Sequence, residues 1–381
     1  MGESTGMFGI VAGLWKDRDP AFAANMQWMC EEHGSPDIGL LGSFGTFSGY
    51  KTLLKTNGVA PQPPAYGSEW FRNTGIVLRN TLGSDRETYL HLIAGSQHDH
   101  YDFDSGSIVL WGKGRLLADD FGYIGRHPAQ WHSMLTSSAV ADDAIMQVDA
   151  FAPSPAFDYL LGRKDAWQRQ IAFMKDADPH GPTGFLIRDT HDADADATWR
   201  LWLTTTGISI HDRGATVVGE DDVDLDIFFF EPAKLSLKTE STVQKGLGRR
   251  DGKEGPIELN QTALVATLHG RSAMTALIFP RLKTDPVPKV TWFADGAGVE
   301  LETPSGTDYL FLATPTRKDG NLLIPKEELT TADGSLAFQC TAGAVQVRRK
   351  TATLTLGTSG KIRFGKLILE NTKPSTRTDP H

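Results

Sequence analysis

The stretch GSIVLWGKGRLLADD at residues 106–120 carries the clearest fold signal in this 381-residue chain. It joins two apolar runs, IVLW and RLLA, through the turn residues Gly112, Lys113 and Gly114. Short apolar runs separated by glycine are typical of antiparallel hairpins. The same punctuation runs from Glu69 to the C-terminus, for example in GIVLRN (75–80), TYLHLIAG (88–95), ATWRLWLTTT (197–206), TALVATLHG (262–270) and ATLTLG (352–357). We therefore expect a mainly β fold, a large antiparallel β-sandwich of two or more sheets.

Helical signals precede these strands. Residues 6–33 predict two helices in a hairpin, with Asp19-Pro20 as a cap followed by a first-turn proline and Gly34 as the stop. A Gly/Pro-rich connector, residues 35–67, follows. One helical or irregular interruption of the strands is expected near residues 158–164. The predicted organisation is a helical hairpin with linker at 1–66, a β-sandwich at 67–290 and a C-terminal β-sheet region at 291–381.

Composition excludes several classes of protein. Hydrophobic residues make up 40% and charged residues 22%, as in ordinary folded proteins. The net charge of −9 argues against a global basic face for nucleic acid. No apolar run approaches the ~18 residues of a membrane span, so no membrane insertion is expected. Cys30 and Cys340 are too few for a disulfide framework, and we expect two buried free thiols.

The densest cluster of reactive side chains lies in residues 95–135. Residues two apart in an extended segment point to the same face, so His98 and His100 can converge on one pocket. A hairpin could return Asp119 or Asp120 beside them, and His132 could follow from the next strand. Histidine and aspartate in this combination suit zinc or a similar divalent ion. A histidine-rich surface loop is the plain alternative.

Other residues of this cluster have simpler interpretations. His127, which precedes Pro128, is expected to face solvent. Asp102 and Asp104 could fix the imidazole tautomers of the histidine pair or form a turn. Elsewhere, the acidic stretch HDADADA (191–197) is expected to be a solvated hairpin loop rather than a calcium site. The basic candidates for an anionic substrate, otherwise solvated loop residues, are Arg163, Lys164, Lys245, Arg249, Arg250 and Lys253.

Several segments in order resemble the sandwich part of the heparinase II/III-like polysaccharide lyases. They are WFRNTGIVLR (70–79), QHDHYDFDSGSIVLWGKGRLLADDFGY (97–123), WHS (131–133), DAWQRQIAFMK (165–175) and GFLIRD (184–189). The first looks like an opening strand pair, the second like the family's H-x-H…D-x-G segment, and the last two like paired strands. DVDLDIFFFEP (222–232) is consistent but less specific. The resemblance covers about residues 1–290.

The resemblance implies an α/α toroid packed on a β-sandwich, with a cleft for a uronate-containing glycan. It places His100, Asp120 and His132 on the positions that hold a structural zinc ion. Asp120 is preferred to Asp119 because it supplies the D-x-G of residues 120–122. His98 falls on the active-site histidine of the sandwich, which faces the substrate carboxylate or the catalytic base. Tyr123 and Arg169 match recurring positions and are interpreted as structural.

The activity so implied is cleavage of an acidic polysaccharide or oligosaccharide by β-elimination at a uronic acid. One group neutralises the carboxylate, a base removes the C5 proton, and an acid protonates the leaving oxygen. His98 could serve the first or second task. The toroid's catalytic tyrosine has no matching position here, and nothing identifies Tyr50 or Tyr66 of the connector as its replacement.

Three functions therefore compete. The first is a polysaccharide lyase, or its zinc-bearing sandwich portion, from a chain shortened at its start. The second is a non-catalytic carbohydrate-binding or structural sandwich, for which tryptophans offer stacking surfaces. The third is a cupin-like barrel with Asp104 as its acidic ligand, against which the spacing argues. The family resemblance favours a periplasmic or extracellular location although the chain shows no signal peptide, and a homodimer is compatible with the sequence.

Overall fold

The computed structural model describes most of the chain in two compact units, residues 1–66 and 67–381. Each unit is described by itself. The described residues are 5–32, 57–95, 102–120, 127–219, 221–230, 235–250, 253–318 and 321–380.

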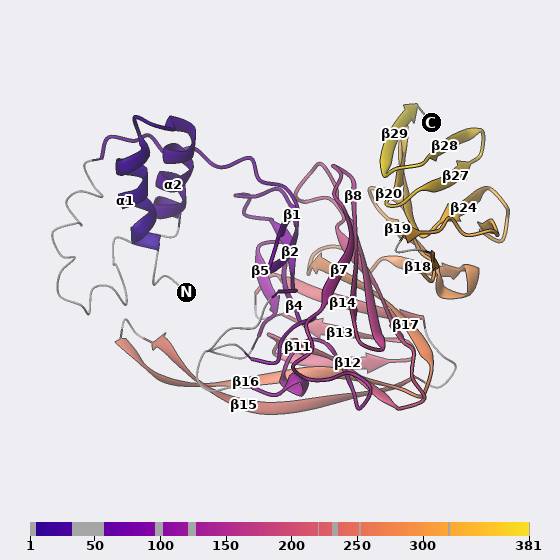
Figure 1. Cartoon of the computed structure of the whole chain (residues 1–381), viewed down its shortest axis with the longest axis horizontal. Helices are drawn as coiled ribbons and strands as arrows, with labels where there is room; N and C mark the ends of the chain where they lie inside the picture. The colour runs from indigo at the N-terminus through magenta and orange to yellow at the C-terminus, as the bar shows by residue number, and fades with distance from the viewer. Residues whose placement is uncertain are drawn as a thin grey trace. The chain divides into compact units, whose positions relative to one another are not determined.

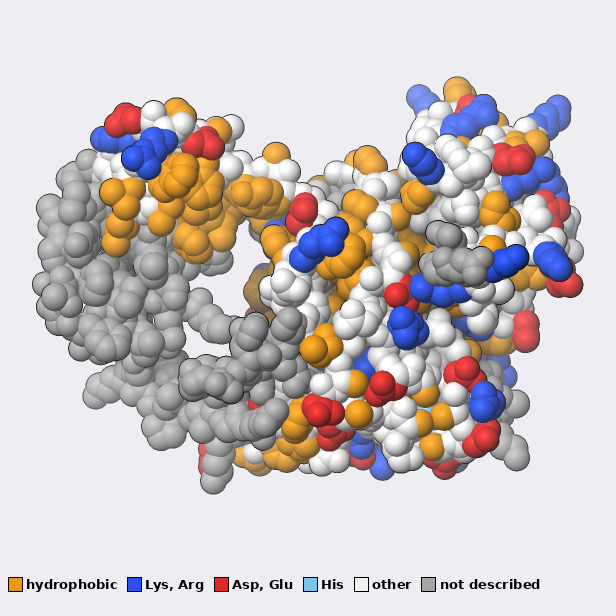
Figure 2. Space-filling model, viewed as in Figure 1, with side chains coloured by type: hydrophobic (Ala, Val, Ile, Leu, Met, Phe, Trp, Pro, Cys, Tyr) orange, Lys and Arg blue, Asp and Glu red, His pale blue; other side chains and the backbone are white. Residues whose placement is uncertain are grey.

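The first unit contains the expected helical hairpin. Helix α1 (Thr5–Trp15) and helix α2 (Pro20–Glu32) are joined by a short turn. The Asp19 carboxylate accepts a hydrogen bond from the backbone N–H of Phe22 at 3.0 Å, which confirms the predicted cap. The predicted stop at Gly34 lies outside the described residues. Leu14 is 70% exposed, and apolar side chains gather on this hairpin (Figure 2).

The second unit begins with a large sheet, sheet A, in which β1 and β2 form the predicted opening pair. Its strands are hydrogen-bonded in the order β1-β2-β3-β4-β5-β11-β16-β15, with β6 also pairing with β11. Every described pair in it is antiparallel. The bounds are β1 (Glu69–Phe71), β2 (Gly75–Asn80), β3 (Thr88–Ile93), β4 (Ile108–Gly112), β5 (Arg115–Ala118), β6 (Leu135–Ser137), β11 (Ala197–Leu203), β15 (Ser236–Arg250) and β16 (Lys253–Leu268).

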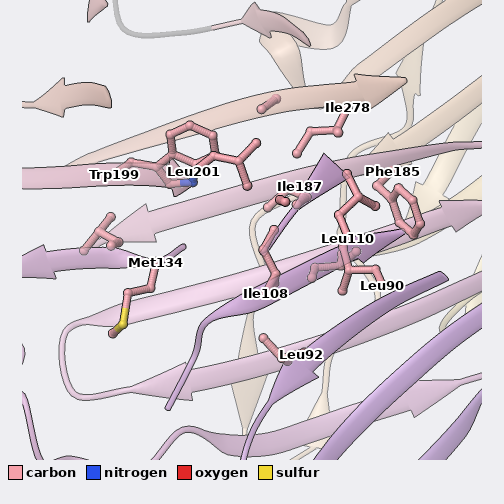
Figure 3. Packing of buried hydrophobic residues seen from close by; sticks show 14 of the residues in the cluster. Leu90, Leu92, Ile108, Leu110, Met134, Phe185, Ile187, Trp199, Leu201 and Ile278 are labelled. Carbon is pink, nitrogen blue, oxygen red and sulfur yellow. The ribbon is translucent and has the colours of Figure 1, made fainter. Parts of the chain in front are cut away.

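A second sheet, sheet B, faces sheet A, and its β9 and β10 form the predicted strand pair. Its order is β12-β13-β14-β17-β10-β9-β8-β7. Figure 3 shows Leu90 and Leu110 of sheet A near Phe185 of sheet B in the core between them. The bounds are β7 (Gln147–Ala152), β8 (Phe157–Lys164), β9 (Trp167–Met174), β10 (Gly184–His191), β12 (Gly207–His211), β13 (Gly214–Val218), β14 (Val223–Phe230) and β17 (Ser272–Leu282).

The C-terminal strands form two further layers, drawn in orange to yellow in Figure 1. Sheet C has the order β18-β19-β20-β25-β26-β29, and sheet E has the order β23-β24-β27-β28. The bounds are β18 (Lys289–Phe293), β19 (Gly298–Thr303), β20 (Gly306–Leu312), β21 (Arg317–Lys318), β22 (Asn321–Leu322), β23 (Leu329–Thr330), β24 (Leu336–Cys340), β25 (Ala342–Arg348), β26 (Thr351–Leu356), β27 (Gly360–Phe364), β28 (Leu367–Asn371) and β29 (Ser375–Pro380), of which β21 and β22 pair with each other.

Hydrophobic cores lie between successive members of the stack formed by sheets A, B, C and E. The first lies between sheets A and B, the second joins Tyr159 and Leu161 of sheet B to Leu310 of sheet C, and the third packs Phe311 of sheet C on Phe338 of sheet E. The predicted fold class, a large antiparallel β-sandwich with a short helical N-terminal segment, is confirmed. The predicted boundary between 290 and 291 stays a prediction. Cys30 and Cys340 are buried cysteines that form no disulfide with each other, as expected.

The predicted interruption near residues 158–164 is wrong, because this segment is strand β8. Leu160 points into the first core, while Tyr159 and Leu161 point into the second. A strand covered on both faces loses the alternation of apolar and polar residues by which strands are recognised. The central position of β8 in the stack therefore hid it from sequence analysis.

The acidic stretch 191–197 is a solvated loop, but it is not a hairpin. It connects β10 of sheet B to β11 of sheet A. Arg271 pairs with Asp192 and Asp194, and His269 pairs with Asp196 at 3.1 Å. These exposed partners come from the turn between β16 and β17, which also crosses between the two sheets. The described helices include none with the length and apolar character of a membrane span.

Candidate functional site

The β4–β5 hairpin carries one of the predicted ligands to the site. Lys113 and Gly114 both have positive φ, 51° and 79°, so they form the two-residue turn that suits a tight hairpin. A side chain at residue 114 would collide with the carbonyl oxygen of Asp85, which explains the glycine. The hairpin ends at Ala118, and Asp119 and Asp120 follow directly.

Asp120 meets His132 in the structure. Asp120 Oδ1 lies 2.5 Å from His132 Nδ1, and the imidazole is fully buried just after the short 3₁₀-helix η1 (Ala129–Trp131). The other ring nitrogen, Nε2, is buried with no hydrogen-bond partner among the described residues. Asp119 instead accepts the backbone N–H of Asp120 at 2.8 Å. Two of the predicted ligands are therefore side by side, with Asp120 rather than Asp119 on the histidine.

A second carboxylate–histidine pair lies beside the first, and sequence analysis missed it. Both His127 Nδ1 and the His127 backbone N–H contact the Asp102 carboxylate, at 2.7 and 2.6 Å. His127 is 9% exposed, so the prediction that it faces solvent is wrong. Its ring stacks on Trp131 and lies 6.5 Å, between ring centroids, from that of His132. No spacing in the sequence signals this pair, since Asp102 and His127 lie on separate loops.

Acidic side chains gather around His132. Burial lowers the pKa of His132, but the hydrogen bond and charge of Asp120 and the charge of Asp104 outweigh burial, and its pKa is raised. Burial and the charge of Asp120 raise the pKa of Asp104 to about 6. Burial also raises the pKa of Asp119. A divalent cation would relieve the repulsion among these carboxylates.

The residues present fit zinc as far as the structure describes them. With Nδ1 engaged by Asp120, Nε2 of His132 is the ring atom left for a ligand, and a buried imidazole nitrogen without a partner is costly. The described residues alone include no group of three that could hold a metal. His98 and His100, the other predicted site residues, lie outside the described residues, as do Tyr50 and Tyr123. Tyr66 is described and 53% exposed.

The proposed basic candidates divide into two kinds. Arg163 is exposed and pairs with Asp149 at 3.3 Å. Lys164 is buried, with Nζ donating to the backbone oxygens of Ser105 and Asp142, so the prediction of a solvated loop residue is wrong. The side chains of residues 245, 249, 250 and 253 lie outside the described part of the structure. Arg169, interpreted as structural, is fully buried.

The antiparallel stack of sheets is also found in solved structures of heparinase III and of a heparan sulfate lyase. The chain is similar to a solved heparinase III gene product, with a TM-score of 0.52 and 16% identity over 70% of this chain and 45% of that one. It is similar to the heparan sulfate lyase HepC from Pedobacter heparinus, with a TM-score of 0.54 and 13% identity over 83% of this chain and 59% of that one. A further heparinase III structure matches with a TM-score of 0.50 and 12% identity, over 68% of this chain and 45% of that one.

The chain therefore has a heparinase-like fold, as the sequence resemblance predicts. It spans between 45 and 59% of the lengths of these solved structures. No family model matches the chain, and no curated protein matches it. At identities of 12 to 16%, the likeness concerns the fold alone.

Proposed function

We propose that this chain is a polysaccharide lyase, or the sandwich portion of one, which cleaves a uronate-containing glycan by β-elimination. The observation that carries the proposal is the buried Asp120–His132 pair with its unpartnered Nε2, set on a heparinase-like fold. His100, Asp120 and His132 would hold the zinc ion. When bound, zinc would supply a structural cross-link between the residue 95–120 hairpin region and the segment after η1.

His98 is the residue of this chain proposed to act on the substrate. Its imidazole would either neutralise the uronate carboxylate, which acidifies the C5 proton, or remove that proton. The partner of the chain would be an acidic polysaccharide or oligosaccharide, in keeping with the heparan sulfate lyases of similar fold. A periplasmic or extracellular location follows from the same proposal, and the homodimer stays a prediction.

Elemental analysis of purified protein tests the metal site first. We expect about one zinc per chain by analogy with closed structural sites, and its loss in His100→Ala and His132→Ala. His191→Ala is the matched control, because His191 is also fully buried with an unpartnered Nε2, yet its Nδ1 contacts the backbone oxygen of Gly270 at 3.1 Å instead of a carboxylate. A wild-type protein without metal, or equal loss in His191→Ala, contradicts the zinc site.

A second candidate function is a non-catalytic glycan-binding sandwich. It is supported by exposed aromatic surface such as Phe71, which is 51% exposed and offers a face on which a sugar ring can stack. Affinity electrophoresis in gels that contain heparan sulfate separates the two functions. Retardation without unsaturated product supports the binding module, while accumulation of product, followed by ultraviolet absorbance, supports the lyase.

A further inference from the structure

Arg169 forms a fully buried, doubly bonded ion pair with Asp189. The two residues lie directly opposite each other on β9 and β10. Arg169 Nε and Nη2 donate to the two carboxylate oxygens of Asp189, both at 2.9 Å, and Trp167 Nε1 donates to Asp189 Oδ1 at 2.8 Å. The guanidinium also lies over the Trp167 ring, 4.7 Å from its centroid. These contacts fix the plane and the direction of the guanidinium.

The remaining terminal nitrogen of Arg169, Nη1, binds backbone next to the candidate site. Nη1 donates to the backbone oxygens of Gly106 at 2.8 Å and Ser133 at 3.1 Å. Ser133 directly follows His132, so its carbonyl sets the direction of the chain that carries the imidazole. Gly106 belongs to the turn in which the Ser107 N–H donates to the Asp104 carbonyl at 2.7 Å. One buried cationic nitrogen therefore joins the segment of His132 to the segment of Asp104.

The packing around this nitrogen leaves little room for adjustment. Gly106 has φ of 103°, and a side chain there would lie 2.5 Å from the Trp167 ring. The Ser133 N–H donates to Ser107 Oγ at 3.1 Å, and Ser133 Oγ accepts the Trp202 N–H at 3.0 Å. These two neutral hydrogen bonds hold the N–H and the hydroxyl of Ser133. The hydrogen bond from Arg169 to the Ser133 carbonyl is the one with a charged donor. Charge-assisted hydrogen bonds in a buried setting are stronger than neutral ones.

We propose that Arg169, oriented by Asp189 and Trp167, is a positioning residue of the Asp120–His132 site. By fixing the carbonyls of Gly106 and Ser133, it sets the orientation in which the His132 imidazole meets Asp120. The inference rests on the proposed function in so far as that site holds zinc. Outer partners that orient a ligand typically change metal affinity by about 10–100-fold.

The experiment compares Arg169→Lys and Arg169→Met with the same changes at Arg281. Arg281 is a chemically matched control, because it is buried, pairs with Asp226 at 2.7 Å and donates Nη1 to the carbonyls of Leu282 and Asp285. Those carbonyls do not belong to the site. Zinc affinity is measured on the purified full chain by competition with a coloured chelator, together with thermal unfolding.

We expect zinc affinity to fall about 10–100-fold in Arg169→Met. It falls less in Arg169→Lys, which keeps the positive charge on a single nitrogen, and it is unchanged in the Arg281 variants. Wild-type affinity in a folded Arg169→Met protein overturns the inference, as does an equal loss in Arg281→Met. If Arg169→Met does not fold, the zinc affinity of Arg169→Lys is compared with that of wild type and Arg281→Lys. Reduced affinity in Arg169→Lys alone supports the inference, and wild-type affinity overturns it.

A second readout needs no metal. Selective ¹⁵N-histidine labelling gives the Nδ1–H resonance of His132 in the metal-free chain, identified by its loss in His132→Asn. The inference predicts that this resonance shifts or broadens in both Arg169 variants and stays unchanged in both Arg281 variants. Unchanged spectra in the Arg169 variants overturn it. A wild-type protein that binds no zinc but shows the predicted shifts contradicts the metal site and leaves the positioning role supported.

Discussion

Asp308 and Arg348 form an ion pair on the neighbouring strands β20 and β25 of sheet C. Arg348 Nη1 lies 2.8 Å from Asp308 Oδ1, and Nη2 of the same guanidinium lies 3.1 Å from Asp176 Oδ2, which follows β9 of sheet B. The side chain of Asp308 is fully buried. Arg348 therefore links the C-terminal layers to the sandwich through two carboxylates.

This pair predicts a pH dependence of stability. Burial raises the pKa of Asp308 to about 6 although Arg348 lowers it. The unfolded chain binds this proton only near pH 3.9, so between about pH 4 and pH 6 the folded protein holds more protons and loses stability as the pH rises. The loss attributable to Asp308 is about 2–3 kcal/mol between pH 4 and pH 7.

Asp308→Asn removes the titrating group and should remove this loss. The measurement is urea unfolding of wild type and variant at pH 4, 5, 6 and 7. We expect the wild type to lose stability relative to the variant as the pH rises. Thr353→Val, a change without a titrating group on the adjacent strand β26, is the control and should show a constant difference from wild type. A constant difference for Asp308→Asn as well contradicts the prediction.

Gly106→Ala should be strongly destabilising. Gly106 has φ of 103°, where residues with side chains are strained, and a methyl group would lie 2.5 Å from the fully buried Trp167 ring. Strain and overpacking together predict a loss of about 2–4 kcal/mol. Gly207→Ala is the matched control, since nothing lies within 4 Å of the added methyl group. Chemical denaturation measures both, and a loss at Gly106 no larger than that at Gly207 contradicts the packing.

Lys164→Met tests the buried lysine that sequence analysis interpreted as a solvated loop residue. Its Nζ donates to the carbonyls of Ser105 at 3.2 Å and Asp142 at 3.1 Å, so methionine keeps the length of the side chain but leaves both acceptors unpaired. We expect a loss of about 1–3 kcal/mol. Lys238→Met, at an exposed lysine paired with Glu240, should stay within about 0.5 kcal/mol of wild type in the same unfolding assay. Equal losses in the two variants would show that the Lys164 contacts carry no net stability.

The strand signals that could be predicted are local. The β4–β5 hairpin was predictable because turn residues and apolar runs specify it within a few positions, whereas the β1–β2 and β9–β10 pairs were predicted from the family resemblance. Strand β8 was missed, since its alternation is erased by burial between two cores. The crossing of residues 191–197 between two sheets was also missed, because a loop's sequence does not say which sheet receives the next strand.

In the candidate site, too, some features could be predicted from the sequence and others depend on tertiary packing. Residue type and spacing left Asp119 and Asp120 open, and the family resemblance, through its D-x-G pattern, selected Asp120 as a zinc ligand beside His132. The structure places Asp120 and His132 in contact, and their role as zinc ligands stays a prediction. The pairing of His127 with Asp102 and the burial of Lys164 depend on which loops pack over the end of the sandwich. Those contacts arise from the tertiary fold. The residues next to His127 and Lys164 in the sequence therefore do not indicate them.

His98→Ala provides the most direct test of lyase activity. The imidazole at residue 98 would neutralise the uronate carboxylate or remove the C5 proton, and loss of such a group typically lowers the rate by about 10²–10⁴-fold. The measurement is the rate of formation of unsaturated product from heparan sulfate and other uronate-containing glycans, with zinc content checked in parallel. His269→Ala is the matched control, since His269 is exposed and pairs with Asp196 in a loop between the sheets. Activity at the wild-type rate in His98→Ala would remove His98 from the mechanism, while loss of zinc together with activity would assign it to the metal site instead.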